Sequence, residues 1–166
     1  MKRSIEGIKK YAGEILEALI IVLVLFFVLF PAKVDGDSME KTLNDGDVIF
    51  VSRAMAWAGM YDDGDIVVFK YNNGNRERRI VKRIAACEGD TAQSIDGQLY
   101  INGKAVEGYF CEESFCYELG KGEYFVIGDN SEESTDSREF GIVRRKDIEA
   151  RAVFRLFPLS EIKSLL

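Results

Sequence analysis

Three polar segments of the sequence carry residue types that could take part in catalysis. Ser38 lies in the first, residues 34–43, among Asp and Gly residues. A serine in such a loop is more often a turn residue or a helix N-cap than a nucleophile. The third segment, residues 127–138, gathers Ser, Thr, Asp and Asn, and its ordinary interpretation is a loop stabilised by side-chain hydrogen bonds. Neither segment indicates catalysis by itself.

The second segment, residues 79–84, has the alternation of a β-strand. This pattern puts Lys82 on the same face as Ile80 and Ile84, which is unusual for a face exposed to solvent. Two interpretations stay open. The lysine could lie on an edge strand and oppose aggregation. Alternatively, it could lie in an apolar setting, where desolvation lowers its pKa and makes the neutral amine available as a base.

The absence of histidine narrows the chemistry that is open to the chain. Ser-His-Asp and Cys-His arrangements are excluded, as is a zinc site that needs imidazole. The base of a hydrolase would therefore be Lys, Asp, Glu, Tyr or an N-terminal amine. No cluster of residues suggests a metal or an organic cofactor. The spacing of Cys111 and Cys116 suits a small-loop disulfide outside the cytoplasm, which would leave Cys87 free.

The first 32 residues have the pattern of a membrane anchor. No charged residue occurs from Ala18 to Ala32, and because a full span needs about 20 residues, we expect the helix to begin upstream of this run. A cleaved secretory signal shares the pattern, but Phe30 occupies a position that a cut after Ala32 would require to be small. Basic residues precede the span and acidic residues soon follow it. The positive-inside rule therefore predicts a cytoplasmic N-terminus and an extracytoplasmic domain over residues 33–166.

After Lys33 the pattern changes to short strands separated by tight turns. Asp-Gly and Asn-Gly pairs lie between the apolar runs and suit tight turns because their residues tolerate positive φ. Residues 94–104 resemble two successive hairpins. The expected strands are 48–52, 65–69, 79–85, 99–101, 124–127 and 152–156. With no long amphipathic helix beyond the anchor, the sequence predicts an all-β domain with a mixed or antiparallel sheet, tethered by a single N-terminal transmembrane helix.

Together, and in this order behind the apolar run, these segments closely resemble the signature boxes of bacterial type I signal peptidases of the small, Gram-positive-like form. The first box of that family is S-M-x-P-T-L, which is matched by Ser38, Met39, Thr42 and Leu43. The other boxes resemble residues 64–69, residues 82–84 with 89–90, and residues 128–138. The resemblance covers nearly the whole chain, and several boxes in order are far more specific than one.

The resemblance implies a role for each matching residue. Ser38 Oγ would attack the carbonyl of the scissile peptide bond. Lys82 would take the proton of Ser38 and later return it to the leaving amine. Ser134 would hydrogen-bond and orient the lysine, and Asp136 and Arg138 would stiffen the site through a salt bridge. These roles describe a serine protease with a Ser/Lys dyad.

The resemblance also implies how the substrate would be held. The oxyanion would be met by the backbone N–H of Ser38 and, in some members, by a serine hydroxyl two residues earlier, where this chain has Gly36. Shallow pockets for small side chains would be lined by apolar strand residues, here Ile66, Val67, Val68 and Ile80. Such pockets fit substrates with Ala at the first and third positions before the cut.

The function implied is that of a membrane-bound serine endopeptidase that removes N-terminal signal peptides from exported preproteins without a cofactor. The expected partners are those signal peptides, the lipid bilayer and the secretion translocon. A net charge of −6, with no basic patch to offset it, argues against nucleic acid as a partner.

Four stretches depart from the family pattern. Lys41 and Glu88 replace prolines, Ala85-Ala86 stands where an apolar residue and Gly are common, and residues 131–133 are Ser-Glu-Glu in place of Arg-Asp-Asn. Glu88, if it turned toward Lys82, would favour the ammonium form and oppose catalysis. These departures suggest a divergent peptidase with a narrow set of substrates, such as surface or pilus subunits. The alternative is an assembly chaperone for pilus or surface proteins that performs no proteolysis.

Overall fold

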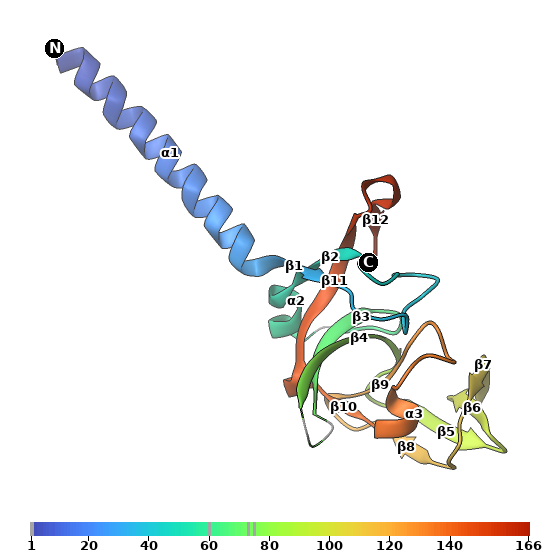
Figure 1. Cartoon of the computed structure of the whole chain (residues 1–166). Coiled ribbons are helices and arrows are strands. Elements are labelled where there is room, and N and C mark those ends of the chain that lie inside the picture. The colour runs from blue at the N-terminus through green and yellow to red at the C-terminus, as the bar shows by residue number, and fades with distance from the viewer. Residues whose placement is uncertain (1, 60, 73, 75) are drawn as a thin grey trace.

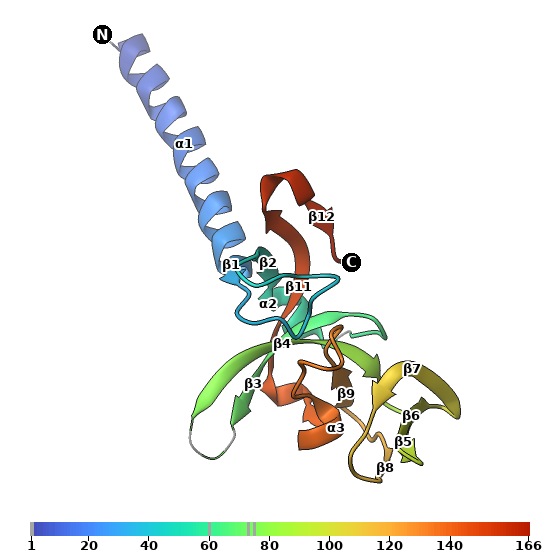
Figure 2. The same cartoon turned by 45° about the vertical axis from the view of Figure 1, so that its right-hand side comes forward.

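The computed structural model describes residues 2–59, 61–72, 74 and 76–166, with the backbone alone at 2–10 and 24–27. A long helix, α1 (Lys2–Val28), projects from a body built of β-strands, as Figures 1 and 2 show from two sides. Within the described residues, no helix combines the length and the hydrophobicity that a membrane span needs.

The body contains a large antiparallel sheet in the order β1-β2-β11-β3-β4-β9-β10, with β12 paired to β11. The bounds of its strands are Leu29–Lys33 for β1, Val48–Ser52 for β2, Ile66–Asn72 for β3, Glu77–Ala86 for β4, Glu123–Ile127 for β9, Val143–Arg144 for β10, Ile148–Phe157 for β11 and Lys163–Ser164 for β12. Strand β3 begins with four buried apolar residues. Because successive side chains of a strand point to opposite faces, Ile66 and Val68 enter one core cluster while Val67 and Phe69 enter another.

A smaller antiparallel sheet follows the order β7-β6-β5-β8 and lies at the end of the molecule away from α1 (Figure 1). Its strands are β5 (Thr91–Ile95), β6 (Gln98–Ile101), β7 (Lys104–Phe110) and β8 (Cys116–Glu118). The turns at Asp96-Gly97 and Asn102-Gly103 have positive φ at both residues, as two-residue hairpins require. The two hairpins expected from residues 94–104 are therefore confirmed.

Short helices and turns complete the body. Helix α2 (Arg53–Ala58) is capped by Ser52, which accepts a hydrogen bond from Met55 N, and ends at Gly59 in the left-handed conformation. Helix α3 (Ser137–Phe140) is capped by Asp136. Two 3₁₀ turns, Arg145–Asp147 and Leu159–Glu161, flank β11.

All six predicted strands are present, and the antiparallel, predominantly β class is confirmed. Two local expectations are corrected. Residues 29–33, expected to continue the N-terminal helix, form β1 because Phe30 and Ala32 pair with β2 and pack against the core. Cys111 and Cys116 are free rather than joined by a disulfide. Each contacts a different part of the β5–β6 hairpin: Cys111 N donates to Gly97 O, whereas Cys116 lies opposite Gln93.

Candidate active site

Lys82 is a buried lysine in the middle of the large sheet. It lies on β4, between β3 and β9, so the edge-strand interpretation is wrong. Lys82 is only 3% exposed, and it lies opposite Val67 on β3. Val67 and Ile84, which is on the same face of β4 as Lys82, belong to one apolar cluster. Loss of hydration in this setting lowers the pKa of Lys82 from its usual 10.5 to about 8. The geometry therefore supports the other interpretation, in which the lysine lies in an apolar environment that lowers its pKa.

Asp136 is the fully buried carboxylate at the centre of a hydrogen-bond network beside Lys82. Its Oδ2 accepts hydrogen bonds from Ser134 Oγ at 2.8 Å and from Gly128 N at 3.0 Å. The guanidinium of Arg138 donates from Nε to Oδ1 at 2.9 Å and from Nη2 to Oδ2 at 3.0 Å. After desolvation, Asp136 has the largest influence on the pKa of Lys82, which it raises, while Arg138 lowers it. The predicted Asp136–Arg138 salt bridge is therefore present, and it fixes the Ser134 hydroxyl.

Ser38 is half-buried in a turn that two apolar side chains anchor. Met39 and Leu43 are 1% and 0% exposed and pack into the core cluster that contains Ile66 and Val68. The turn carries Ser38 to the strand end after β9, where Asn130 N donates to Ser38 O at 3.0 Å. The sequence pattern of residues 38–43 thus has a physical basis, because burial of these side chains fixes the position of the serine.

Gly128 brings Ser38 and Ser134 close to one another. A Cβ atom on Gly128 would lie 2.2 Å from Ser134 Oγ and 2.4 Å from the backbone oxygen of Ser38, which is closer than real contacts allow. Only glycine fits between them. The structure thus brings together Ser38 with Ser134, and Ser134 with Asp136 and Arg138, and the charges of Asp136 and Arg138 act on Lys82.

Arg83 links three of the segments and was not singled out as a site residue from the sequence. It lies on the opposite face of β4 from Lys82 and donates to Asp129 with Nε at 2.8 Å and with Nη2 at 2.6 Å. Its Nη1 donates to Gly64 O, and Nη2 also donates to Thr42 Oγ1. One side chain thereby connects the serine turn, the turn before β3 and the loop after β9. Its position next to Lys82 was the signal that could have identified it.

Three further residues to which the family pattern drew attention are Gly36, Glu88 and Lys41. Gly36 is exposed, and its N–H donates to Asp45 Oδ1 at 2.9 Å. Glu88 is exposed and lines a separate cavity with Tyr124 and Arg144, so it does not turn toward Lys82. Lys41, where the family pattern has proline, adopts a φ of 86°, which proline cannot reach.

The residues expected to line substrate pockets are distributed over two cores. Ile66 and Val68 pack in one cluster, whereas Val67 and the half-buried Ile80 belong to the other. Ile66, Val67 and Val68 are at most 4% exposed. Their contact with a substrate stays a prediction.

Two of the three cysteines, Cys87 and Cys111, are not activated as nucleophiles. Burial raises the pKa of the Cys87 thiol to about 12 and also raises the pKa of the Cys111 thiol. Because the thiolate is the reactive form of cysteine, neither thiol is activated near neutral pH.

Comparisons with known proteins identify the family to which the chain is similar. A family model described as signal peptidase, peptidase S26, matches residues 8–157. Signal peptidase I of Bacillus amyloliquefaciens is 37% identical over 165 residues, which cover 90% of this chain and 87% of that protein. Signal peptidase I S of Bacillus subtilis is 34% identical over 176 residues, covering 95% of this chain and 94% of that protein.

Two further proteins extend the comparison. Signal peptidase IB of Staphylococcus aureus is 31% identical over 181 residues, covering 90% of this chain and 93% of that protein. Among solved structures, a signal peptidase I from Enterococcus faecalis is 26% identical, with a TM-score of 0.43, and covers 55% of this chain and 95% of that chain.

Proposed function

The chain belongs to the signal peptidase family, and from this membership we propose that it removes signal peptides from exported preproteins with Ser38 as nucleophile and Lys82 as general base. The observation that carries the catalytic assignment is the burial of Lys82 in an apolar part of the sheet, which lowers its pKa to about 8. A lysine with this pKa holds about a tenth of its population as the free amine at pH 7, whereas an ordinary lysine holds less than about a thousandth.

In the proposed reaction, the neutral amine of Lys82 takes the proton of Ser38 Oγ as the oxygen attacks the scissile carbonyl. The resulting ammonium gives the proton to the leaving amine, and an acyl group stays on Ser38. The same amine then activates a water molecule that releases the acyl group and restores the serine. The position of Ser134 is consistent with a supporting role. Its Oγ donates a hydrogen bond to Asp136, which holds it beside the backbone of Ser38.

For the oxyanion we propose the backbone N–H of Ser38 as the donor. Gly36 has no hydroxyl, and its own N–H is already bonded to Asp45. A single preorganised donor of this kind is typically worth about 10²–10³ in rate.

The membrane topology is part of the proposal. We take residues 1–32 as a cytoplasmic basic segment with a single-pass anchor and residues 33–166 as the extracytoplasmic catalytic domain. The charge-free run from Ala18 to Ala32 and the basic residues before it support this topology. The anchor would place the site near the lipid bilayer and the secretion translocon, where signal peptides emerge.

The cleavage site we propose has Ala at the first and third positions before the cut. Ile66, Val67, Val68 and Ile80 are apolar strand residues within or beside the segments that match the family's boxes, and they would limit the substrate to small side chains.

A cleavage assay tests the proposed function. A preprotein with an Ala-x-Ala site is incubated with the full chain in detergent, using wild type, Ser38→Ala and Lys82→Met. Exposed residues supply matched controls, Ser160→Ala and Lys104→Met. We expect both site variants to lose at least about 10³-fold in rate and both controls to retain the wild-type rate. Wild-type protein that binds the preprotein without cleaving it would instead favour the assembly-chaperone alternative.

A further inference from the structure

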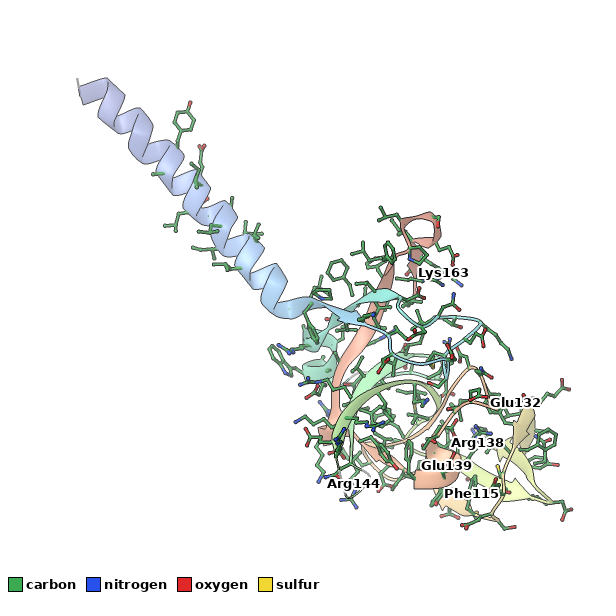
Figure 3. All side chains as sticks on the ribbon, in the orientation of Figure 1. Phe115, Glu132, Arg138, Glu139, Arg144 and Lys163 are labelled. Carbon is green, nitrogen blue, oxygen red and sulfur yellow. The ribbon has the colours of Figure 1, made fainter. Side chains whose placement is uncertain are left out.

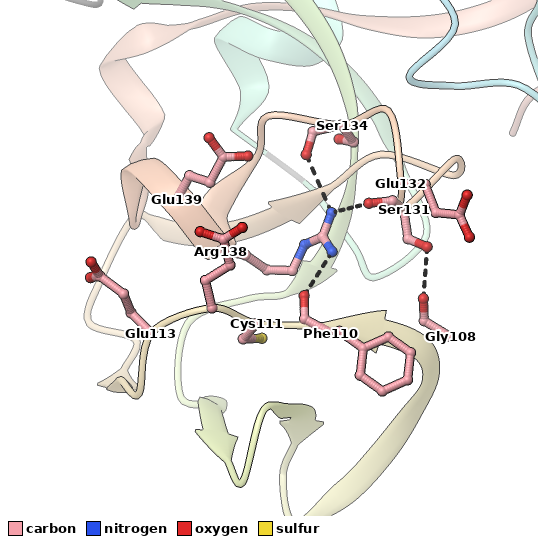
Figure 4. A pocket seen from close by; sticks show the side chains of 10 residues that line it. Gly108, Phe110, Cys111, Glu113, Ser131, Glu132, Ser134, Arg138 and Glu139 are labelled. Atoms are coloured by element: carbon pink, nitrogen blue, oxygen red, sulfur yellow. Dashed lines mark hydrogen bonds between the residues drawn. The ribbon is translucent and has the colours of Figure 1, made fainter.

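A cavity of about 550 Å³ adjoins the candidate active site, in the size range of peptide and ligand pockets (Figure 4). It lies between the end of β7 and the loop that leads into α3, and Ser134 belongs to both the cavity wall and the site. Phe110, at the end of β7, is 72% exposed and forms part of the lining. This ring offers an apolar surface that the aliphatic part of a substrate side chain can contact.

The charge of the lining is strongly negative. Four carboxylates line the cavity, from Glu112, Glu113, Glu132 and Glu139. None of them forms an ion pair with another residue in the part of the chain that the structure describes. Arg138 is the cation of the lining, but its charge is already matched by the buried Asp136.

The donors of Arg138 are also occupied. Nη1 donates to Phe110 O at 3.0 Å and Nη2 to Ser131 O at 2.8 Å (Figure 4), and Nε and Nη2 also donate to Asp136. The cavity therefore presents an apolar ring and several uncompensated carboxylates, a combination that suits the aliphatic stem and cationic head of Lys or Arg.

The position of the cavity shows which part of a substrate can reach it. Asn130, whose N–H is bonded to Ser38 O, is followed directly by Ser131 in the cavity wall. Since Ser134 also belongs to both the site and the cavity wall and an extended chain rises about 3.3 Å per residue, a substrate chain enters the cavity within a few residues of the scissile bond. The labelled Glu132, Arg138 and Glu139 lie at the end of the molecule away from α1 (Figure 3).

The usual composition of signal peptides indicates on which side of the cleavage site a basic residue could reach the cavity. The residues before the cut are small or apolar, and the basic region lies beyond an apolar core of about 7–15 residues. A cation within reach of the cavity therefore comes from residues after the cut.

Resting on the proposed function, we propose that this cavity binds Lys or Arg side chains located about three to five residues after the cleavage site, in the mature part of the exported chain. Glu112 and Glu132 face the cationic heads and Phe110 contacts their aliphatic stems. The Ser-Glu-Glu stretch that departs from the family pattern contributes one of these carboxylates. The preference is for a basic mature N-terminus, and it would give a physical basis to the narrow substrate range that the departures from the family pattern suggest.

Two substrates that are identical through the Ala-x-Ala site and differ only after it test this inference. One has Lys-Lys-Lys at the third to fifth positions after the cut, and the other has Gln-Gln-Gln. For the full chain in non-ionic detergent at low salt, we expect kcat/KM to be about fivefold higher for the Lys substrate, from two solvent-exposed charge pairs. The ratio should fall as salt is raised.

Charge-matched variants separate the cavity from the overall charge. In Glu112→Gln with Glu132→Gln, we expect the ratio to approach one. In Glu107→Gln with Glu118→Gln, which removes the same charge from exposed positions outside the cavity, it should stay about fivefold. A ratio of one in the wild type, or an unchanged ratio in the cavity variant, would overturn the inference while leaving the proposed function intact.

If neither substrate is cleaved, the proposed function fails and binding decides the inference. Fluorescence anisotropy then compares labelled Lys and Gln peptides on the full Ser38→Ala chain. Tighter binding of the Lys peptide that depends on Glu112 and Glu132 supports the cavity assignment, and equal binding of the two peptides overturns it.

Discussion

Replacement of Asp136 by Asn should destabilise the protein far more than an isosteric change usually does. The two carboxylate oxygens accept hydrogen bonds from Ser134 Oγ, Gly128 N, Arg138 N and two guanidinium nitrogens of Arg138. An amide offers a single acceptor oxygen, so in either orientation at least two of these donors lose their partner. The substitution also leaves the Arg138 guanidinium without its counter-charge, and its side chain is only 9% exposed. Breaking a buried pair in this way costs about 3–5 kcal/mol.

Thermal unfolding of the full chain in detergent measures this effect. At roughly 2–4 °C per kcal/mol for a protein of this size, the midpoint should fall by roughly 6–20 °C. The control is Glu149→Gln, which removes the partner of Arg79, a side chain that is 67% exposed. That change should cost at most about 1 kcal/mol, because solvent screens the pair. Equal shifts for the two variants would refute the view that the Asp136 network is buried and mutually dependent.

Two further substitutions test the geometry around Ser38. Gly128→Ala should reduce cleavage by about 10²-fold or more, because the added Cβ displaces Ser134 Oγ and Ser38 O. In Gly120→Ala, where the Cβ meets only the flexible end of Glu123, the cleavage rate should be retained. Lys41→Gly should leave the unfolding midpoint equal or slightly raised, because glycine accepts a φ of 86° without the steric cost of about 1–2 kcal/mol, whereas Lys41→Pro should lower both midpoint and activity. A proline variant as stable as the glycine variant would show that the turn does not need this backbone conformation.

The parts of the site that the sequence predicts well are those in short local patterns. The alternation of residues 80–84 places Lys82 with Ile80 and Ile84, and the structure confirms that this face is apolar. The Asp136–Arg138 salt bridge, which the family resemblance implied, is also present, and its two residues lie in one helix cap. Local alternation was enough for the first prediction, whereas the second depended on the family pattern.

Long-range contacts are the part that the sequence did not reveal. Arg83 bonds to Asp129 and Thr42, which are 46 and 41 residues away, and no local pattern indicates such pairs. Strand β1 was also missed, because an apolar run suits a helix or a strand equally and only the distant partner β2 decides. Pro31 gave a usable signal, since the residue before a proline disfavours helix and proline is tolerated on an edge strand such as β1.

The sequence also contains signals for both ends of helix α2, although no helix was predicted there. Ser52 is a helix N-cap and Gly59 a left-handed C-cap, and both residue types are typical of helix ends. The apolar residues between them divide between core and solvent: Ala56 is buried, and Trp57 is 63% exposed.

The dependence of kcat/KM on pH tests the central claim most directly, because Lys82 must be neutral to act as a base. Burial lowers its pKa to about 8, so the active fraction rises about tenfold per pH unit below this value, reaches about half at pH 8 and levels off above pH 9. Cleavage of an Ala-x-Ala peptide by the full chain should therefore show an ascending limb with its midpoint near pH 8. A limb that continues to rise toward the ordinary lysine pKa of 10.5, or a rate that is already constant from pH 6, would contradict Lys82 as a base with a lowered pKa.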